Sequence, residues 1–188
     1  MPTPARTSLD AIVRSGRAIL EAEGLAGLTM QRVADAVGVR PPSLYKRVRN
    51  RGALVRLIAS DVARELGQTV ADAATTGDAR TDLRAIAVTF RSFAHAHPRA
   101  YRLLFDPLPD GWRPDRDASR EAVQVLFRVL GDAVGPAEAL EAARTLVAWA
   151  YGFVSMELAD TFRLGGDVDA AFAYGVERLV DAIAPDIP

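Results

Sequence analysis

The stretch that decides the fold is residues 28–54, LTMQRVADAVGVRPPSLYKRVRNRGAL. Two short helical patterns flank Gly38, and glycine readily adopts the left-handed conformation with which many helices end. Between residues 36 and 60 there are cations but no Asp or Glu. The cations are Arg40, Lys46, Arg47, Arg49, Arg51 and Arg56. A helix-turn-helix with a basic surface free of acidic side chains suits the DNA major groove, so this stretch predicts a DNA-binding unit.

The composition limits the class of protein. The chain has 188 residues and is 49% hydrophobic, which is enough for a sizeable core and argues against disorder. It contains no Cys, which excludes disulfides and thiolate metal sites and is typical of a cytoplasmic protein. No apolar run approaches the ~20 residues of a membrane span, so no membrane partner is expected.

The net charge of -1 conceals a strong asymmetry. Residues 1–60 carry ten Lys and Arg against four acidic residues, a charge of +6, whereas residues 61–188 carry thirteen Arg against twenty acidic residues, a charge of -7. This asymmetry favours a basic, nucleic-acid-binding head on an acidic body. The alternative is chance clustering of charges on solvated faces.

Helical periodicity recurs along the chain without a clear alternating strand, which predicts an all-α fold. We expect a three-helix helix-turn-helix domain in residues 1–50 and a connecting fourth helix at about 51–75. Residues 76–188 are expected to form a C-terminal helical bundle, with about nine helices in all. The later helices are expected at about 82–97, 99–105, 119–134, 137–164 and 168–184.

Local signals mark the helix ends in the N-terminal part. Gly24 is expected to stop the first helix, and Thr29 and Asn50 to cap the second and fourth. Pro41 fits the first turn of the third helix, because the amide hydrogen that proline lacks has no helical partner there. Leu44 is expected to anchor this third helix, of about seven residues, on the first two.

Three ordered motifs between residues 9 and 54 resemble the N-terminal domain of TetR-family transcriptional repressors. They are IVRSGRAILEAEG leading into LTMQRVADAVGV, then PSLYKRV, and then NRGAL. The sequence departs from the family pattern at Arg40, where Ser is common, at Val48, where a large aromatic is usual, and at Gly52, where an acidic residue is frequent. Val48 predicts a thinner contact between the third and fourth helices, and Gly52 removes a possible capping carboxylate.

The resemblance implies that Tyr45 and Lys46 contact the DNA backbone and that the exposed side of residues 40–43 approaches the bases. Thr29 and Arg51 open helices whose N-termini favour a phosphate through their free amides and positive dipole end. The candidate DNA-binding residues are Thr29, Arg40, Pro41, Ser43, Tyr45, Lys46, Arg47 and Arg51.

In the C-terminal half, HPRAYRLLFD (97–106) and WAYGFVSMELA (149–159) resemble a TetR subgroup named for a Trp-His-Gly signature, although Tyr151 stands where that histidine would be. The resemblance implies a small-molecule effector and a homodimer. Candidate pocket residues are Phe90, Phe93, His97, Tyr101, Phe105, Phe127, Trp149, Phe153 and Met156, and the alternative is that these side chains are simply core. Candidate dimer residues are Ala148, Gly152, Ser155, Leu158, Ala159, Phe172, Ala173, Val176, Leu179 and Val180, and these helices are also expected to close the monomer core.

The leading functional hypothesis is a repressor that binds double-stranded DNA as a dimer and is released by a small molecule. An activator of the same architecture is equally compatible with the sequence. An all-helical enzyme is disfavoured because we find no recognisable catalytic arrangement. A module that binds an acidic protein through the basic head is a further alternative. No cofactor or metal is expected, since there is no Cys and His95 and His97 point to different sides of a helix.

Overall fold

The structure is a computed structural model that describes residues 8–185. Within this range the chain forms nine α-helices and one short 3-10 helix, with no strand, which confirms the all-α prediction. The described residues divide into two compact units. The first comprises residues up to Arg64 together with His97–Ser119, and the second comprises Glu65–Ala96 together with residues from Arg120 onward.

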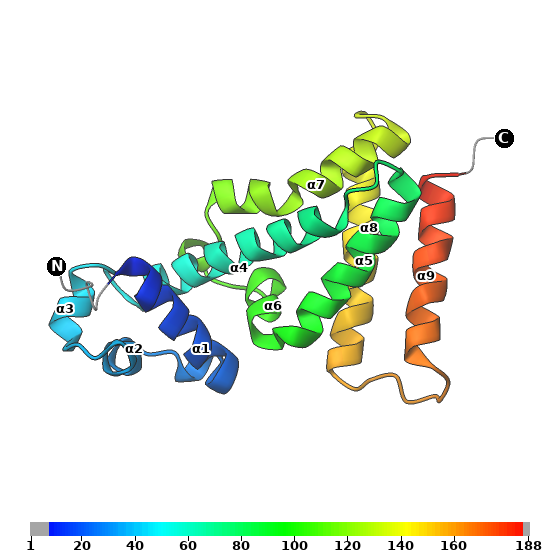
Figure 1. Ribbon diagram of the computed structural model, residues 1–188. Coiled ribbons are helices and arrows are strands. Elements are labelled where there is room, and N and C mark those ends of the chain that lie inside the picture. The colour runs from blue at the N-terminus through cyan, green and yellow to red at the C-terminus, as the bar shows by residue number, and fades with distance from the viewer. Residues whose placement is uncertain (1–7, 186–188) are drawn as a thin grey trace. The chain divides into compact units, whose positions relative to one another are not determined.

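The first unit is built around α1 (Leu9–Gly27), which packs against α2 (Met30–Val37) and α6 (Pro98–Phe105) (Figure 1). The regular helix of α1 is broken at Gly24, which has φ 76°, as predicted. One further helical turn follows the break, so α1 extends to Gly27. The short α3 (Pro41–Tyr45) packs against α2.

Hydrogen bonds connect α1 to α6. The Glu21 carboxylate accepts a hydrogen bond from the backbone N–H of Ala100 at 2.7 Å, and the Arg99 guanidinium donates to the Glu21 carbonyl at 2.9 Å. His97, the residue before α6, provides no side-chain cap. Glu21 therefore satisfies an N–H at the start of α6 that has no partner within the helix.

The long α4 (Arg51–Ala73) begins in the first unit and ends in the second. Asn50 caps it as predicted, because the Asn50 Oδ1 accepts from the Ala53 N–H at 2.8 Å. Near its start, α4 lies so close to α1 that a Cβ at Gly16 would be 2.8 Å from Ile58 Cδ1.

The second unit contains α5 (Ala79–Ala96), α8 (Ala139–Leu158), α9 (Val168–Ile183) and, from Arg120 onward, α7 (Arg116–Val134). The helix α5 packs against α8 and α9, and the latter two run side by side in opposite directions (Figure 1). A Cβ at Gly67 of α4 would lie 2.8 Å from the Ala122 Cα of α7, so glycine permits this backbone approach.

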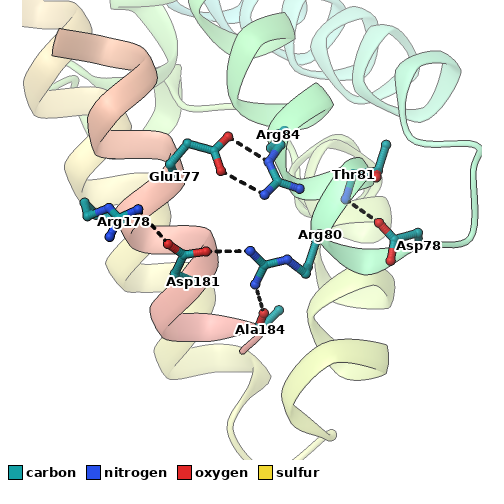
Figure 2. Close-up of polar contacts among 8 residues, drawn as sticks. All are labelled: Asp78, Arg80, Thr81, Arg84, Glu177, Arg178, Asp181 and Ala184. Carbon is teal, nitrogen blue, oxygen red and sulfur yellow. Dashed lines mark hydrogen bonds and ion pairs between the residues drawn. The ribbon is translucent and has the colours of Figure 1, made fainter. Parts of the chain in front are cut away.

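Arginines of α5 bind acidic residues of α9 in a ladder (Figure 2). Arg84 makes a bidentate pair with Glu177, with Nε–Oε1 at 2.7 Å and Nη2–Oε2 at 2.8 Å. One turn away, Arg80 donates to Asp181 Oδ1 at 2.5 Å and also to the Ala184 carbonyl. The bidentate geometry fixes how the two helices align as well as holding them together.

One carboxylate is almost fully buried in this unit. The Asp82 side chain accepts hydrogen bonds from Thr76 N–H at 3.0 Å, Thr76 Oγ1 at 2.8 Å and Gly77 N–H at 3.3 Å. Burial alone would raise the pKa of Asp82, but these hydrogen bonds outweigh burial and hold the pKa below its usual value. Asp82 thereby fixes the turn between α4 and α5.

Helix boundaries were mostly predicted within a few residues, with one clear error. The helix expected to run to Leu164 ends at Leu158. Asp160 adopts φ 52°, its N–H donates to the Glu157 carbonyl, and the Thr161 N–H donates to the Met156 carbonyl. This is the Schellman pattern, which ends a helix and here uses Asp in place of the usual glycine.

Smaller differences concern α3 and the domain division. The helix α3 has five residues, where about seven were expected. Residues 97–119 pack with the first unit, although they lie within the range 76–188 predicted as the C-terminal domain. The predicted domains, residues 1–50 for DNA binding and 76–188 for effector binding and dimerisation, were defined by function. Packing does not test a function, so these bounds stay a prediction.

Candidate nucleic-acid interface

The turn between α2 and α3 is fixed by backbone hydrogen bonds and one glycine. Gly38 has φ 73°, and the N–H groups of Gly38 and Val39 donate to the carbonyls of Asp35 and Ala34 at 3.1 and 2.9 Å. At the other end of α2, Thr29 Oγ1 accepts from the Arg32 N–H at 3.2 Å. Both ends of α2 are thus defined by the residues predicted to define them.

The helix α3 is held by a single buried side chain. Leu44 is fully buried, and its carbonyl accepts from the N–H groups of Arg47 and Val48, both at 2.9 Å. Truncating a buried leucine costs about 2–5 kcal/mol, so Leu44 is a strong anchor for so short a helix.

The candidate DNA-binding residues lie in the first unit and mostly at its surface. Tyr45 is half exposed, and Lys46 and Arg47, which follow α3 directly, are exposed. Arg40, the residue before α3, is also exposed, whereas Pro41 and Ser43 are half-buried. Thr29 is exposed at the start of α2, with its hydroxyl engaged in the cap.

Arg51 differs from the other candidates because its side chain turns back into the protein. Its Nε donates to the Leu28 carbonyl at 2.7 Å, and its Nη2 donates to the Leu25 carbonyl. Its guanidinium carbon lies 5.0 Å from the ring centre of Trp112. The Arg51 side chain is therefore engaged with backbone carbonyls, and a phosphate at the start of α4 would have to be bound by backbone amides.

The departures from the family pattern have different structural consequences. Val48, which stands where the family usually has a large aromatic, is buried at 2% exposure. A Cβ at Gly52 would lie 2.9 Å from Trp112 Cδ1 and closer still to Nε1. Gly52 thus makes room for an indole that the local sequence did not predict.

The predicted pocket residues do not all belong to one unit. His97, Tyr101 and Phe105 lie in the first, where the Tyr101 and Phe105 rings are 5.1 Å apart. Phe90, Phe93, Phe127, Trp149, Phe153 and Met156 lie in the second.

Within the second unit, Trp149 and Phe153 of α8 form an aromatic cluster with two rings that were not among the pocket candidates. Trp149 stacks on Phe172 with ring centres 5.4 Å apart, and Phe153 lies 4.8 Å from the ring of Phe162. Met156, by contrast, is 47% exposed, which places it at the surface of this chain.

The predicted dimer residues separate by burial. Phe172, Val176 and Val180 are buried within the chain, so they belong to the core and present no surface to a second subunit. Their spacing places them on the inner stripe of α9, where periodicity alone does not distinguish core from interface. The remaining candidates are exposed or half-buried: Ala148, Gly152, Ser155, Leu158, Ala159, Ala173 and Leu179. Tyr174, which was not a candidate, is 69% exposed beside them on α9.

Among residues 8–185, no three His, Asp or Glu side chains are grouped so as to hold a metal ion. None of the helices described is long and apolar enough to cross a bilayer.

Comparisons with known proteins agree with this architecture. Residues 6–58 match the family described as bacterial regulatory proteins, tetR family, and residues 83–179 match the tetracyclin repressor-like, C-terminal domain. An uncharacterized HTH-type transcriptional regulator of Mycobacterium tuberculosis, Rv0681, is 30% identical over 185 residues, covering 93% of this chain and 84% of that protein.

Solved structures share the fold. A protein with unknown function from Rhodococcus sp. RHA1 has a TM-score of 0.81 at 21% identity, covering 97% of this chain and 100% of the other. A TetR variant from Acinetobacter baumannii AYE in complex with minocycline has a TM-score of 0.67 at 21% identity, covering 94% and 96%. The relatives by sequence are transcriptional regulators rather than enzymes, and DNA and ligand binding are typical of them. This chain belongs to the TetR family of bacterial transcriptional regulators.

Proposed function

We propose that this regulator is a repressor that binds a palindromic DNA operator as a homodimer and leaves it when a small molecule binds the C-terminal domain. The observation that carries the DNA-binding part is the placement of Tyr45, Lys46 and Arg47. They are exposed around a helix anchored by the buried Leu44, inside a stretch, residues 36–60, that has no acidic residue. This stretch carries no acidic side chain that would repel a phosphate, and it offers several hydrogen-bond donors to the backbone of a DNA duplex.

Within this surface the residues have different roles. Lys46 and the Tyr45 hydroxyl bind phosphate oxygens, which positions the protein without regard to base sequence. Arg40, Pro41 and Ser43 face the base edges, and the planar guanidinium of Arg40 suits the two acceptors of a guanine. The amides that open α2 and α4, at Thr29 and Arg51, bind phosphates.

The dimer forms through α8 and α9, which run side by side. Small exposed or half-buried residues on these helices, such as Ala148, Gly152 and Ala173, permit close approach of a second copy. A two-fold interface is self-complementary and would set two copies of α3 about 34–36 Å apart, the length of one DNA turn.

The effector is a small, largely apolar molecule, because the second unit is rich in aromatic side chains such as Trp149, Phe153 and Phe172. A TetR variant of similar fold has been crystallised in complex with minocycline, which supports a small-molecule effector for this chain. The effector shifts the protein towards a non-binding conformation only by its difference in affinity for the two states. Assignment to the Trp-His-Gly subgroup stays a prediction from residues 97–106 and 149–159.

The direct test is selection of duplexes from a random DNA library with the full-length protein, followed by a salt titration on the selected site. We expect an inverted repeat whose half-site centres lie about 10 bp apart. Lys46→Ala should weaken binding on all sequences and reduce the salt slope by about one per monomer. Arg40→Ala should change the preferred sequence. Arg102→Ala, which removes an exposed cation from α6, is the control for net charge.

Lys46 also offers a direct footprint, because it is the only lysine in the chain. Amine-reactive labelling followed by mass spectrometry should show protection of Lys46 by the selected duplex. An equally labelled Lys46 with and without bound DNA, or selection that enriches no sequence, would overturn the proposed interface.

Dimerisation and release need separate measurements. Sedimentation should give twice the mass of the 188-residue chain. Addition of the effector, found by thermal shift in a library of small apolar compounds, should lower DNA affinity. A ligand that stabilises the protein and tightens DNA binding would contradict the release mechanism.

A further inference from the structure

The start of α4 is held by Arg51, whose guanidinium reaches the carbonyls near the end of α1. It donates to Leu28 O at 2.7 Å and to Leu25 O. The last carbonyls of a helix have no partner within it and lie at its negative end. The last turn of α1 contains no basic residue, so Arg51 brings a cation to it from a distant part of the sequence.

The other side of this guanidinium is covered by Trp112. This residue ends the 3-10 helix Asp110–Trp112 in the loop between α6 and α7, and its ring centre lies 5.0 Å from the Arg51 Cζ. That distance and the stacking are those of a cation–π interaction. The indole also occupies the place where a side chain at residue 52 would begin, since a Cβ at Gly52 would lie 2.9 Å from Trp112 Cδ1.

The same loop is attached to α4 a second time, two turns further on. The Asp115 N–H donates to the Oγ of Ser60, which is buried, at 2.9 Å. The Asp115 carboxylate caps α7 through the Ala118 N–H at 2.8 Å and approaches Arg64 at 3.3 Å. The Ala118 N–H hydrogen bond, more than any other influence, lowers the pKa of Asp115. The loop is therefore fixed against α4, and Trp112 has a defined position.

We propose that Arg51 and Trp112 are positioning residues for DNA binding, and that the Arg51 side chain does not contact a phosphate. The proposal rests on the proposed function and deepens it. Arg51 follows directly on the Asn50 cap and lies five residues after Lys46. Arg51 ties the first turn of α4 to the carbonyls of Leu28 and Leu25, and Trp112 holds its guanidinium in place. Together they set where the DNA-facing residues before α4 lie relative to α2.

The test compares DNA binding by the full-length protein and its variants on the selected duplex. Arg51→Lys keeps the charge but lacks the planar fork, and Trp112→Ala keeps every cation. Each should weaken binding by about tenfold, the loss expected when one cation–π contact and its alignment are removed. Trp112→Ala should leave the salt slope unchanged. The double variant Arg51→Ala/Trp112→Ala should bind about as well as Arg51→Ala alone, because both changes break one contact.

Controls separate positioning from general damage to the loop. Arg113 follows Trp112 and its side chain is exposed. The variant Arg113→Ala should therefore bind DNA as the wild type does. Trp112→Phe keeps an apolar ring and should fall between wild type and Trp112→Ala, which keeps the test informative if the alanine variant folds poorly.

Fluorescence reports the contact itself, because Trp112 and Trp149 are the only tryptophans. In a Trp149→Phe background, Arg51→Ala or Gly52→Ala should shift Trp112 emission to longer wavelength, whereas Lys46→Ala should not. The proposal is overturned if wild-type protein binds DNA, Trp112→Ala and Arg51→Lys bind equally well, and Arg51→Ala lowers the salt slope by about one per monomer. That result would make Arg51 a phosphate contact, whereas absence of binding by the wild type would refute the proposed function itself.

Discussion

Arg91 joins α5 to both α8 and α9, and its replacement is expected to destabilise the second unit mainly through one partner. Its Nε donates to Glu157 Oε2 at 2.9 Å, and its Nη2 donates to Glu157 Oε1 and, at 2.6 Å, to Asp169 Oδ1. The Glu157 side chain is 13% exposed and the Asp169 side chain 82% exposed. The two carboxylates therefore depend on Arg91 to very different degrees.

The magnitude follows from that difference in exposure. Arg91→Met keeps most of the apolar stem and leaves Glu157 with His95, whose Nε2 lies 3.1 Å away. Removing one partner of a buried ion pair costs about 3–5 kcal/mol, and residual exposure and His95 reduce this to about 2–3 kcal/mol. The exposed pair with Asp169 adds less than about 0.5 kcal/mol. For a chain of this size, the melting temperature should fall by about 4–12 °C.

The assay is urea and thermal unfolding at one fixed protein concentration, because dimerisation makes apparent stability depend on concentration. Asp169→Asn is the matched control and should change the free energy of unfolding by less than about 0.5 kcal/mol. Arg91→Met/Glu157→Met should recover most of the loss, since no unpaired charge stays behind. Equal destabilisation by Arg91→Met and Asp169→Asn, or strict additivity in the double variant, would refute the reasoning.

Three further predictions concern backbone geometry and pH. Gly38→Ala should cost about 1–2 kcal/mol, because the residue has φ 73° in the turn before α3, and should weaken DNA binding in parallel; an unchanged urea midpoint would contradict it. Gly67→Ala should lower the free energy of unfolding by about 1–3 kcal/mol, because its Cβ would meet the backbone of α7. Gly131→Ala is the control: no atom lies within 4 Å of its new Cβ, so the same urea titration should show stabilisation by about 0.5–1 kcal/mol. A hydrogen bond from Arg91 lowers the pKa of Glu157, so this carboxylate stabilises the fold above its unfolded pKa of about 4.3, and the contribution is lost as pH falls through the lower folded pKa. Glu157→Gln should therefore flatten the fall in stability below about pH 4 that urea titrations of the wild type show.

The features predicted best are those whose cause is local. Thr29 and Asn50 cap their helices with their own side chains, and Gly38 ends α2 because its backbone conformation excludes most other residues. Each signal lies within four residues of the structure it produces. The helix-turn-helix was therefore predictable without knowledge of the rest of the chain.

The wrong predictions depend on contacts between residues far apart in the sequence, or on a residue type that is unusual at its position. The end of α8 was missed because Asp160, which is not a glycine, adopts φ 52° and ends the helix before Gly165 is reached. The inward turn of Arg51 was missed because Trp112 lies far away in the sequence. The buried members of the predicted dimer surface, such as Val176, were assigned from periodicity, which reports an apolar face without saying what covers it.

Gly52 shows how one local departure from a family pattern acquires meaning only in the fold. Taken alone, it removes a carboxylate and weakens the start of α4. In the structure it admits Trp112, which covers the guanidinium next to it. A side chain at residue 52 would meet the indole, so Trp112 would have to move away from Arg51. The DNA-contact role that the motif assigns therefore stays a prediction at Lys46, which is exposed, whereas at Arg51 the neighbouring groups decide where the side chain points.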